Sequence, residues 1–225
     1  MKKIRIAIDG PAGAGKSSVS KLVAEKLGYF YVDTGAIYRS LALIMIKKGI
    51  SLDNEPSIEN ELKSFDIRFK MEGGINHIFL NGEDVTKDIR TEEVSMLASS
   101  VSAIPFVRKE LFDIQRAYAE KGGVVMEGRD IGTVIIPEAE LKIFLTASPL
   151  KRAQRRLLDL KAKGIADISL ETLADEIKKR DEQDSNREIA PLKPASDSVI
   201  VDNSDIDLDQ TAEKIVNYAV ERMGE

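Results

Sequence analysis

Cysteine is absent from the 225-residue sequence, and histidine occurs once, as His77. These shortages exclude disulfide bonds, thiolate zinc sites and histidine clusters, and they leave Mg²⁺, held by oxygen atoms, as the metal that suits this chain. The sequence also lacks an apolar run near the length of a membrane span, and no charged segment followed by an apolar one opens it. We therefore expect a cytoplasmic protein with no membrane partner.

The sequence also lacks an excess of basic residues over acidic ones. The net charge is −5 and the sequence pI is about 5.2, which argues against a nucleic-acid backbone as the main partner. Hydrophobic residues make up 43% and charged residues 32%, as in an ordinary folded protein, so the composition excludes a disordered chain. For this length we expect one main domain with a smaller insertion.

The most specific motif is a glycine-rich loop at 10–17 that fits G-x-x-x-x-G-K-[ST] at every position. Glycines let such a loop wrap closely, so that backbone N–H groups point at the phosphates of a nucleotide. We expect Lys16 to reach the β- and γ-phosphates of ATP and the Ser17 hydroxyl to ligate Mg²⁺. The predicted ATP-binding residues are Gly10, Pro11, Ala12, Gly13, Ala14, Gly15, Lys16, Ser17 and Ser18.

The surroundings of this loop favour a nucleotide site over a chance glycine-rich turn. A β-branched strand pattern covers 3–8, and apolar residues at helical spacing run from Val19 to a stop at Gly28. A helix that starts directly after the loop directs its N-terminal dipole at bound phosphates.

A second ligand region is predicted after a short strand at 29–32. This strand ends in Asp33-Thr34-Gly35 and passes into a helix that carries Arg39. Ligands bind at the carboxyl edge of parallel sheets, so these side chains are candidates for a second pocket. A purely structural alternative stays open, with Thr34 as the N-cap of the helix and Arg39 in solvent.

A buried strand at 124–126 leads into a third polar stretch, Glu127-Gly128-Arg129-Asp130. Packing alone does not require charged residues at the end of an apolar strand, so we interpret them as part of a site. The alternative is a turn held by an ion pair between Arg129 and a carboxylate.

The segment 66–90 changes to an alternating pattern with a hairpin signal at Asn81-Gly82, which predicts a small antiparallel meander. His77 lies within it, and a solvated or edge-strand position is favoured over a ligand or general base. Helical patterns follow at 91–102 and 105–118.

The arginine-rich segment after Ser148-Pro149 predicts two helices joined at Gly164, the second beginning at about Ser169. Arg152, Arg155 and Arg156 are expected on one helical face, and the second helix ends in the charged run 180–187. These helices suit a mobile lid, although an ordinary solvated charged face is the alternative.

Outside the meander, five strand patterns alternate with helices. This predicts an α/β class, a three-layer P-loop fold with a five-stranded parallel sheet, a small antiparallel β insertion and a helical lid. The absence of N-K-x-D argues against a GTPase, and a remodelling ATPase is usually larger. A small-molecule kinase needs arginines and Mg²⁺ around two anionic substrates, which fits this sequence. A nucleotide-gated binding module that catalyses little remains the alternative.

Four motifs together resemble the bacterial cytidylate kinases, in order and over nearly the whole chain: I-D-G-P-A-G-A-G-K-S-S, D-T-G-A-I-Y-R, E-G-R-D-I-G-T-V, and R-D-E-Q-D-S-N-R with A-P-L. The resemblance implies transfer of the ATP γ-phosphoryl group to CMP or dCMP in pyrimidine nucleotide metabolism. We also expect Mg²⁺ as the metal and a monomeric protein. The resemblance also implies a core of 1–35, 91–150 and 195–225, a nucleoside monophosphate-binding region of 36–90 with its hairpin insertion at about 64–90, and a lid of 151–190.

By this resemblance, Thr34, Arg39 and Arg129 hold the phosphate of the acceptor. Ser99, Arg108 and Asp130 contact cytosine, and Arg180, Asp184 and Arg187 hold the sugar or the phosphates. Lys16, Arg39, Arg129 and Arg180 form the expected catalytic set. Two positions depart from the family pattern: Thr34 stands where many relatives have serine, and Glu127 where aspartate is common.

Overall fold

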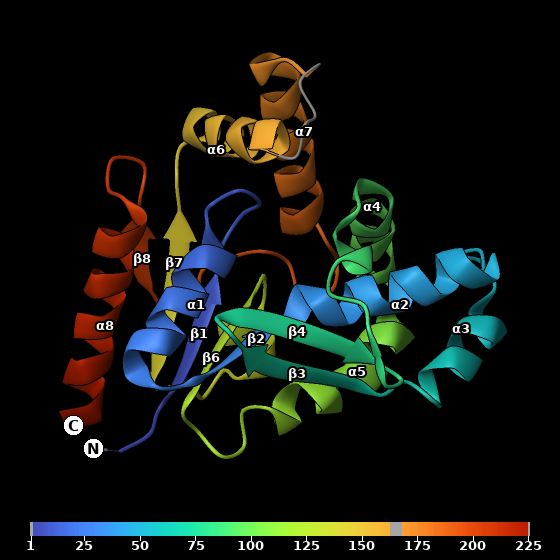
Figure 1. Ribbon diagram of the computed structural model, residues 1–225, viewed down its shortest axis with the longest axis horizontal. Coiled ribbons are helices and arrows are strands. Elements are labelled where there is room, and N and C mark those ends of the chain that lie inside the picture. Colours follow the sequence, from blue (N-terminus) through green and yellow to red (C-terminus); the bar gives the residue numbers. More distant parts are fainter. Residues whose placement is uncertain (1, 163–167, 225) are drawn as a thin grey trace. The chain divides into compact units, whose positions relative to one another are not determined.

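A computed structural model describes residues 2–162 and 168–224 (Figure 1). The chain divides into two compact units, which we call unit 1 (Met1–Phe30 with Lys121–Glu225) and unit 2 (Tyr31–Glu120). The three-part division into core, monophosphate-binding region and lid stays a prediction. Within the described residues, no helix combines the length and the apolar character needed to cross a membrane.

A five-stranded sheet carries the α/β fold and confirms the predicted class. Its strand order is β2-β6-β1-β7-β8, and β1 pairs in parallel with both of its neighbours. The strands are β1 (Arg5–Asp9), β2 (Phe30–Asp33), β6 (Val124–Gly128), β7 (Leu141–Thr146) and β8 (Val199–Asp202). Ile6 and Ile8 are fully buried, as expected for a parallel strand that is covered on both faces.

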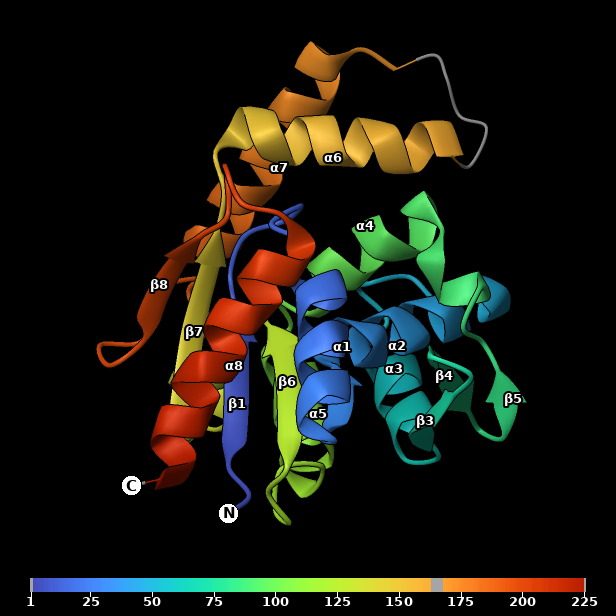
Figure 2. The ribbon, with the colours of Figure 1, turned by 60° about the vertical axis from the view of Figure 1, so that its left-hand side comes forward.

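Two helices of unit 1 pack against each other and cover one face of this sheet (Figure 2). α1 (Lys16–Leu27) begins directly after the glycine-rich loop, and Gly28 ends it in the left-handed conformation. α8 (Leu208–Gly224) lies alongside and buries Ala212, Ile215 and Ala219. The predicted order of strand, glycine-rich loop and helix is therefore confirmed.

The segment after β7 forms α6 (Pro149–Ala162), and α7 (Leu170–Ser185) packs against it. Ala153, Leu160, Leu173 and Ile177 form the small core between these two helices. The predicted joint at Gly164 lies outside the described residues. A π-helical turn, η2 (Ile131–Ile135), follows β6 and was not predicted from the sequence.

Unit 2 is built around the buried helix α2 (Thr34–Lys48), which packs against α3 (Glu55–Leu62) and α4 (Glu92–Val101). The 3₁₀ turn η1 (Asp88–Arg90) also packs on α2, and α5 (Pro105–Ala117) contacts α3. Asp33 caps α2 by accepting a hydrogen bond from the Ala36 backbone N–H over 3.0 Å. The N-cap is therefore Asp33 and not Thr34.

The predicted meander is present as an antiparallel sheet of β3 (Ile67–Glu72), β4 (Ile75–Leu80) and β5 (Glu83–Asp84). Asn81 and Gly82 have φ angles of 50° and 89°, as the predicted tight turn requires. His77 lies on the central strand and not on an edge strand, but its side chain is 29% exposed, which fits the solvated half of the expectation. Its Nδ1 lies 2.8 Å from Oδ2 of Asp84, because β4 and β5 bring the two side chains together.

Candidate active site

The glycine-rich loop of unit 1 depends on glycine for steric reasons. A Cβ atom on Gly10 would lie 2.0 Å from the carbonyl oxygen of Leu145, a distance that no side chain tolerates. Gly13 and Gly15 have φ angles of 75° and 85°, in the region that glycine occupies without strain. The loop therefore packs closely on β7 and on the start of α6.

Lys16 is buried, and its ammonium group donates to the carbonyl oxygens of Gly10 and Pro11 over 2.8 and 2.7 Å. Burial lowers the pKa of Lys16 well below its usual value, and the positive charges of Arg129 and Arg180 lower it further. The carboxylates of Glu127 and Asp184 oppose this shift. The electrostatic environment of Lys16 thus includes several residues that the sequence predicted for the site.

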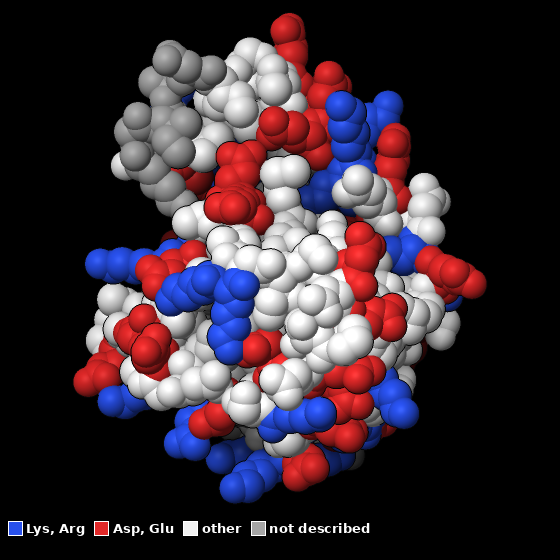
Figure 3. Space-filling view, turned by 90° about the vertical axis from the view of Figure 1, so that its right-hand side faces the viewer, with Lys and Arg blue, Asp and Glu red and all other residues white. Residues whose placement is uncertain are grey.

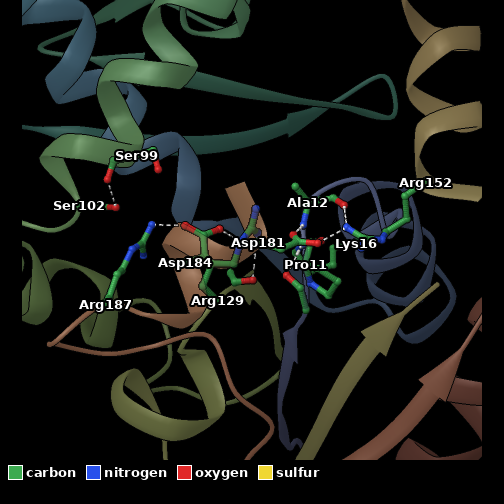
Figure 4. Close-up of polar contacts among 12 residues, drawn as sticks. Pro11, Ala12, Lys16, Ser99, Ser102, Arg129, Arg152, Asp181, Asp184 and Arg187 are labelled. Carbon is green, nitrogen blue, oxygen red and sulfur yellow. Dashed lines mark hydrogen bonds and ion pairs between the residues drawn. The ribbon is translucent and has the colours of Figure 1, made fainter. Parts of the chain in front are cut away.

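Arg152 on α6 and Asp181 on α7 both form hydrogen bonds with the glycine-rich loop. Arg152 donates through Nη1 to the Ala12 carbonyl oxygen over 2.9 Å, and this atom also lies 2.6 Å from Oδ2 of Asp181 (Figure 4). Asp181 in turn accepts from the backbone N–H of Ala12 over 3.3 Å. Sequence reasoning missed Asp181, although it directly follows Arg180 in the R-D-x-x-D pattern.

A second set of hydrogen bonds connects α6 with the segment after β8 and with the loop. Arg155 donates to the side-chain and backbone oxygens of Asn203 over 2.9 and 2.6 Å, and Asn203 donates to the Ala14 carbonyl oxygen over 3.0 Å. Asn203 was not predicted, because no motif marks it. Arg152, Arg155 and Arg156 stand at positions i, i+3 and i+4 of α6 and so share one helical face, as expected. Arg152 is buried, whereas Arg156 is exposed.

Asp184 on α7 forms ion pairs with Arg129 and Arg187, which were both predicted to bind the acceptor. Its Oδ2 accepts from Nε of Arg129 over 2.8 Å, and its Oδ1 pairs with Arg187, as Figure 4 shows. Burial would raise the pKa of Asp184, but the charges of Arg129 and Arg187 outweigh it and hold the pKa below its usual value. The carboxylate is therefore ionised at neutral pH and fixes both guanidinium groups.

The end of β6 places Glu127 and Asp130 in buried positions. A further buried carboxylate, Asp9 at the end of β1, accepts hydrogen bonds from the backbone N–H groups of Ile131 and Gly132. Burial raises the pKa of Asp9 to about 6. Asp9 was not predicted as a site residue, although it lies in the I-D-G-P stretch at the loop entrance.

In unit 2, Asp33 holds Arg39 at the start of α2. The Nη2 atom of Arg39 lies 2.6 Å from Oδ2 of Asp33, and the side chain is only 19% exposed. A Cβ atom on Gly35 would lie 2.8 Å from Nη1 of Arg39, so the glycine leaves room for the guanidinium group. Thr34 is buried beside it. The solvated-arginine alternative is therefore wrong.

The other two predicted residues of unit 2 are Ser99 on α4 and Arg108 on α5. Arg108 is buried, donates to the Ser102 carbonyl oxygen over 3.1 Å, and lies 5.8 Å from the ring centre of Tyr38. Ser102 donates to the carbonyl oxygen of Ser99 over 2.8 Å (Figure 4). Ser99 and Arg108 are thus connected through Ser102, which the sequence did not single out.

Comparison with known proteins gives consistent results. The family model described as cytidylate kinase matches residues 6–221. A protein of Caldicellulosiruptor bescii named cytidylate kinase is 51% identical over 96% of this chain and 95% of its own length. One of Ligilactobacillus salivarius with the same name is 49% identical over 99% of both chains.

Among solved structures, an uncharacterized protein from Eubacterium ventriosum has a TM-score of 0.53 at 18% identity, with 96% of this chain and 98% of that chain covered. At this identity the likeness supports the fold alone. The nearly complete match to the family model and the high identity to its named members decide the family. The chain belongs to the cytidylate kinase family.

Proposed function

We infer that this protein transfers the γ-phosphoryl group of ATP to CMP or dCMP, which yields ADP and CDP or dCDP. The observation that carries this inference is the arginine pair held by Asp184, in the same unit as a complete phosphate-binding loop. A loop alone suits any nucleotide-binding protein, but fixed guanidinium groups beside it suit a second phosphate. Family membership supplies the acceptor class.

We assign donor binding to the loop from Gly10 to Ser17, with Ser18 beside it. Lys16 stays with the carbonyl oxygens of Gly10 and Pro11 only until a phosphate provides a stronger, charged partner. The predicted catalytic role of Lys16 is then to follow the γ-phosphoryl group during transfer. Arg129, Arg39 and Arg180 would neutralise the charge that spreads over its oxygen atoms.

The donor atoms present fit Mg²⁺. Ser17 is half-buried at the start of α1 and offers a hydroxyl oxygen, which is a ligand type that Mg²⁺ accepts. Within residues 2–162 and 168–224, no three carboxylate, histidine or cysteine side chains are grouped to hold a metal. Ser17 would therefore hold the ion together with phosphate oxygens and water, and the ion would neutralise phosphate charge.

For the acceptor, we propose that Thr34, Arg39 and Arg129 bind the phosphate of CMP. Arg180, Asp184 and Arg187 would hold the sugar, or in part the phosphates. A phosphate monoester is already an anionic nucleophile, so the transfer needs positioning and charge neutralisation but no general base.

We propose that Ser99, Arg108 and Asp130 recognise cytosine. A carboxylate and a hydroxyl group can accept from the exocyclic amine of cytosine, which uracil lacks. A site of this kind disfavours UMP, because its buried polar groups would stay unpaired.

Small-molecule substrates suit the surface better than a nucleic acid does. On the face drawn in Figure 3, basic and acidic side chains are intermixed without a broad basic patch, and the net charge is −5. We further propose that the protein acts as a monomer in the cytoplasm.

The decisive experiment measures ADP formation with CMP, dCMP, UMP, AMP and shikimate in turn, in the presence of ATP and Mg²⁺. We expect turnover with CMP and dCMP and much weaker turnover with UMP. A protein that is inert with CMP but active on AMP or shikimate would overturn the assignment. ATP binding without any turnover would instead identify a nucleotide-gated switch.

A further inference from the structure

We propose that Asp9 is a positioning residue of the phosphotransfer site. Its side chain fixes the turn that follows Arg129 and Asp130, and so sets these two residues relative to the phosphate-binding loop. The proposal rests on the proposed function, because Arg129 and Asp130 are assigned there to CMP. Asp9 itself is not expected to contact either substrate.

The geometry of Asp9 is that of a bidentate anchor. Oδ1 accepts from the backbone N–H of Ile131 over 2.8 Å, and Oδ2 accepts from that of Gly132 over 2.7 Å. These distances are at the short end for N–H···O bonds, as expected when the acceptor is charged. Both bonds span more than a hundred residues of sequence, so they join β1 to the segment after β6.

The first backbone N–H groups of η2 need a hydrogen-bond acceptor from outside this turn. In η2, the N–H groups of Val134 and Ile135 bond to the carbonyl oxygen of Asp130, and that of Ile136 bonds to Ile131. The first N–H groups of a helical turn have no partner within the turn. Asp9 satisfies two of them from another strand and thereby fixes the residue that directly precedes the turn, Asp130.

The place of Asp9 in the chain gives this anchor its functional meaning. Asp9 is the last residue of β1 and directly precedes Gly10, the first residue of the phosphate-binding loop. One side chain therefore connects the loop assigned to ATP with the strand end assigned to CMP. Phosphoryl transfer is sensitive to small displacements between donor and acceptor, so a rigid connection here affects the reaction.

Stability alone does not account for a carboxylate at this position. Asp9 is buried, and burial together with the charge of Asp130 disfavours its ionised form, although Lys16 and the two N–H groups favour it. A neutral side chain would avoid the burial of charge. A carboxylate does, however, offer two equivalent acceptor atoms to two neighbouring N–H groups, whereas asparagine offers one acceptor and turns its NH₂ group toward the other N–H.

The test is Asp9→Asn in the full-length protein, with separate measurement of KM for CMP and for ATP. Loss of one hydrogen bond to a charged acceptor corresponds to an increase of about tenfold, and we expect it in KM for CMP, with less than about a twofold change for ATP. Glu140→Gln is the matched control, because Glu140 accepts from the backbone N–H of Arg5 at the opposite end of β1. It should leave both KM values unchanged.

Gly132→Ala tests the same contact from its other side and decides the matter if Asp9→Asn does not fold. The added Cβ would lie 3.2 Å from Cδ of Lys142 and 3.4 Å from Oδ2 of Asp9, so either the Lys142 side chain or the turn that carries the Gly132 N–H must shift. A selective rise of KM for CMP in either variant supports the proposal. Unchanged KM values, or an equal rise for CMP and ATP, overturn it. A wild-type protein that is inactive on CMP would instead refute the proposed function.

Discussion

Arg129 at the end of β6 donates through Nε to Oδ2 of Asp184 on α7, over 2.8 Å. Asp184 is almost inaccessible, with 2% of its side chain exposed, and its other oxygen pairs with Arg187. The carboxylate thus fixes an arginine of the sheet edge relative to the arginine-rich helix. A guanidinium group carries five N–H donors, so the bond to Asp184 uses only part of the donor capacity of Arg129.

Asp184→Asn should weaken CMP binding and lower stability. The amide keeps the shape of the side chain but loses the charge that pairs with Arg129 and Arg187, and a hydrogen bond between charged groups contributes about 2 kcal/mol. We expect KM for CMP to rise by about tenfold or more and the free energy of unfolding to fall by a similar energy. Steady-state kinetics and urea unfolding measure the two effects.

Asp205→Asn is the control for this variant. Asp205 pairs with Lys151 over 3.7 Å, and both side chains are exposed, so the pair should contribute little. If Asp184→Asn behaved like Asp205→Asn in both measurements, the arginine pair would have no role in substrate binding.

Lys16→Ala should abolish turnover and leave the protein folded. Among residues 2–162 and 168–224, the ammonium group donates only to two carbonyl oxygens of the loop, and its burial already lowers its pKa, so its loss removes little stability. In the reaction the same group is expected to stabilise transferring phosphate, and such donors contribute about 10²–10³ in kcat. Lys26→Ala, an exposed lysine of the same helix, is the control.

The readouts for Lys16→Ala are ADP formation and the thermal unfolding midpoint. A folded variant with near-normal turnover would remove Lys16 from the catalytic set. A variant without a cooperative thermal transition would show that the buried lysine is needed for the fold of the loop.

Arg108→Ala should affect the acceptor and spare the donor. Arg108 is buried on α5, where it donates to the Ser102 carbonyl oxygen and lies over the Tyr38 ring, so it is fixed for recognition of a planar base. We expect KM for CMP to rise by about tenfold or more, with ATP affinity unchanged. The neighbouring exposed residue provides the control, Lys109→Ala. Equal effects of the two substitutions on KM for CMP would argue against a base-binding role.

The sequence predicted those parts of the structure that depend on local patterns. The glycine-rich loop, the parallel sheet and the meander turn at Asn81-Gly82 follow from spacing and residue type, and all three are present. Arg39 and Arg129, predicted as site residues from the polar stretches after two strands, are held by Asp33 and Asp184, and their roles toward a substrate stay predictions. These features are encoded within short segments, which is why one sequence is sufficient to find them.

The missed residues are those whose role comes from a partner far away in the sequence. Asp9 bonds to the turn after β6, Asp181 to the phosphate-binding loop, and Asn203 to Arg155. Asp9 and Asp181 stand within quoted motifs and Asn203 stands outside them, but in no case does the local sequence name the distant partner, so only the three-dimensional contacts reveal the role. The misplaced His77 has the same origin, because strand order within the meander depends on pairing and not on local composition.

The last prediction concerns the pH dependence of stability, to which Asp9 contributes with an unusual sign. Burial raises its pKa from 3.8 to about 6, so the folded protein holds the proton more tightly than the unfolded chain does. The resulting stabilisation is fully present below the unfolded pKa and is lost as the pH rises through about 6. For a pKa shift of this size, the contribution of Asp9 to the free energy of unfolding changes by roughly 3 kcal/mol.

Most paired carboxylates act in the opposite direction, as Asp184 does: its pKa is lowered, so its stabilisation is lost as the pH falls. The contribution of Asp9 is therefore isolated by the difference in unfolding free energy between wild type and Asp9→Asn, measured by urea unfolding from about pH 4 to about pH 7. Because the variant cannot titrate at this position, wild type should lose stability relative to it as the pH rises. If the two curves of unfolding free energy against pH ran parallel, Asp9 would have an ordinary pKa. If the curve of the wild type falls relative to that of Asp9→Asn as the pH rises, the ionised carboxylate is retained at the expense of stability.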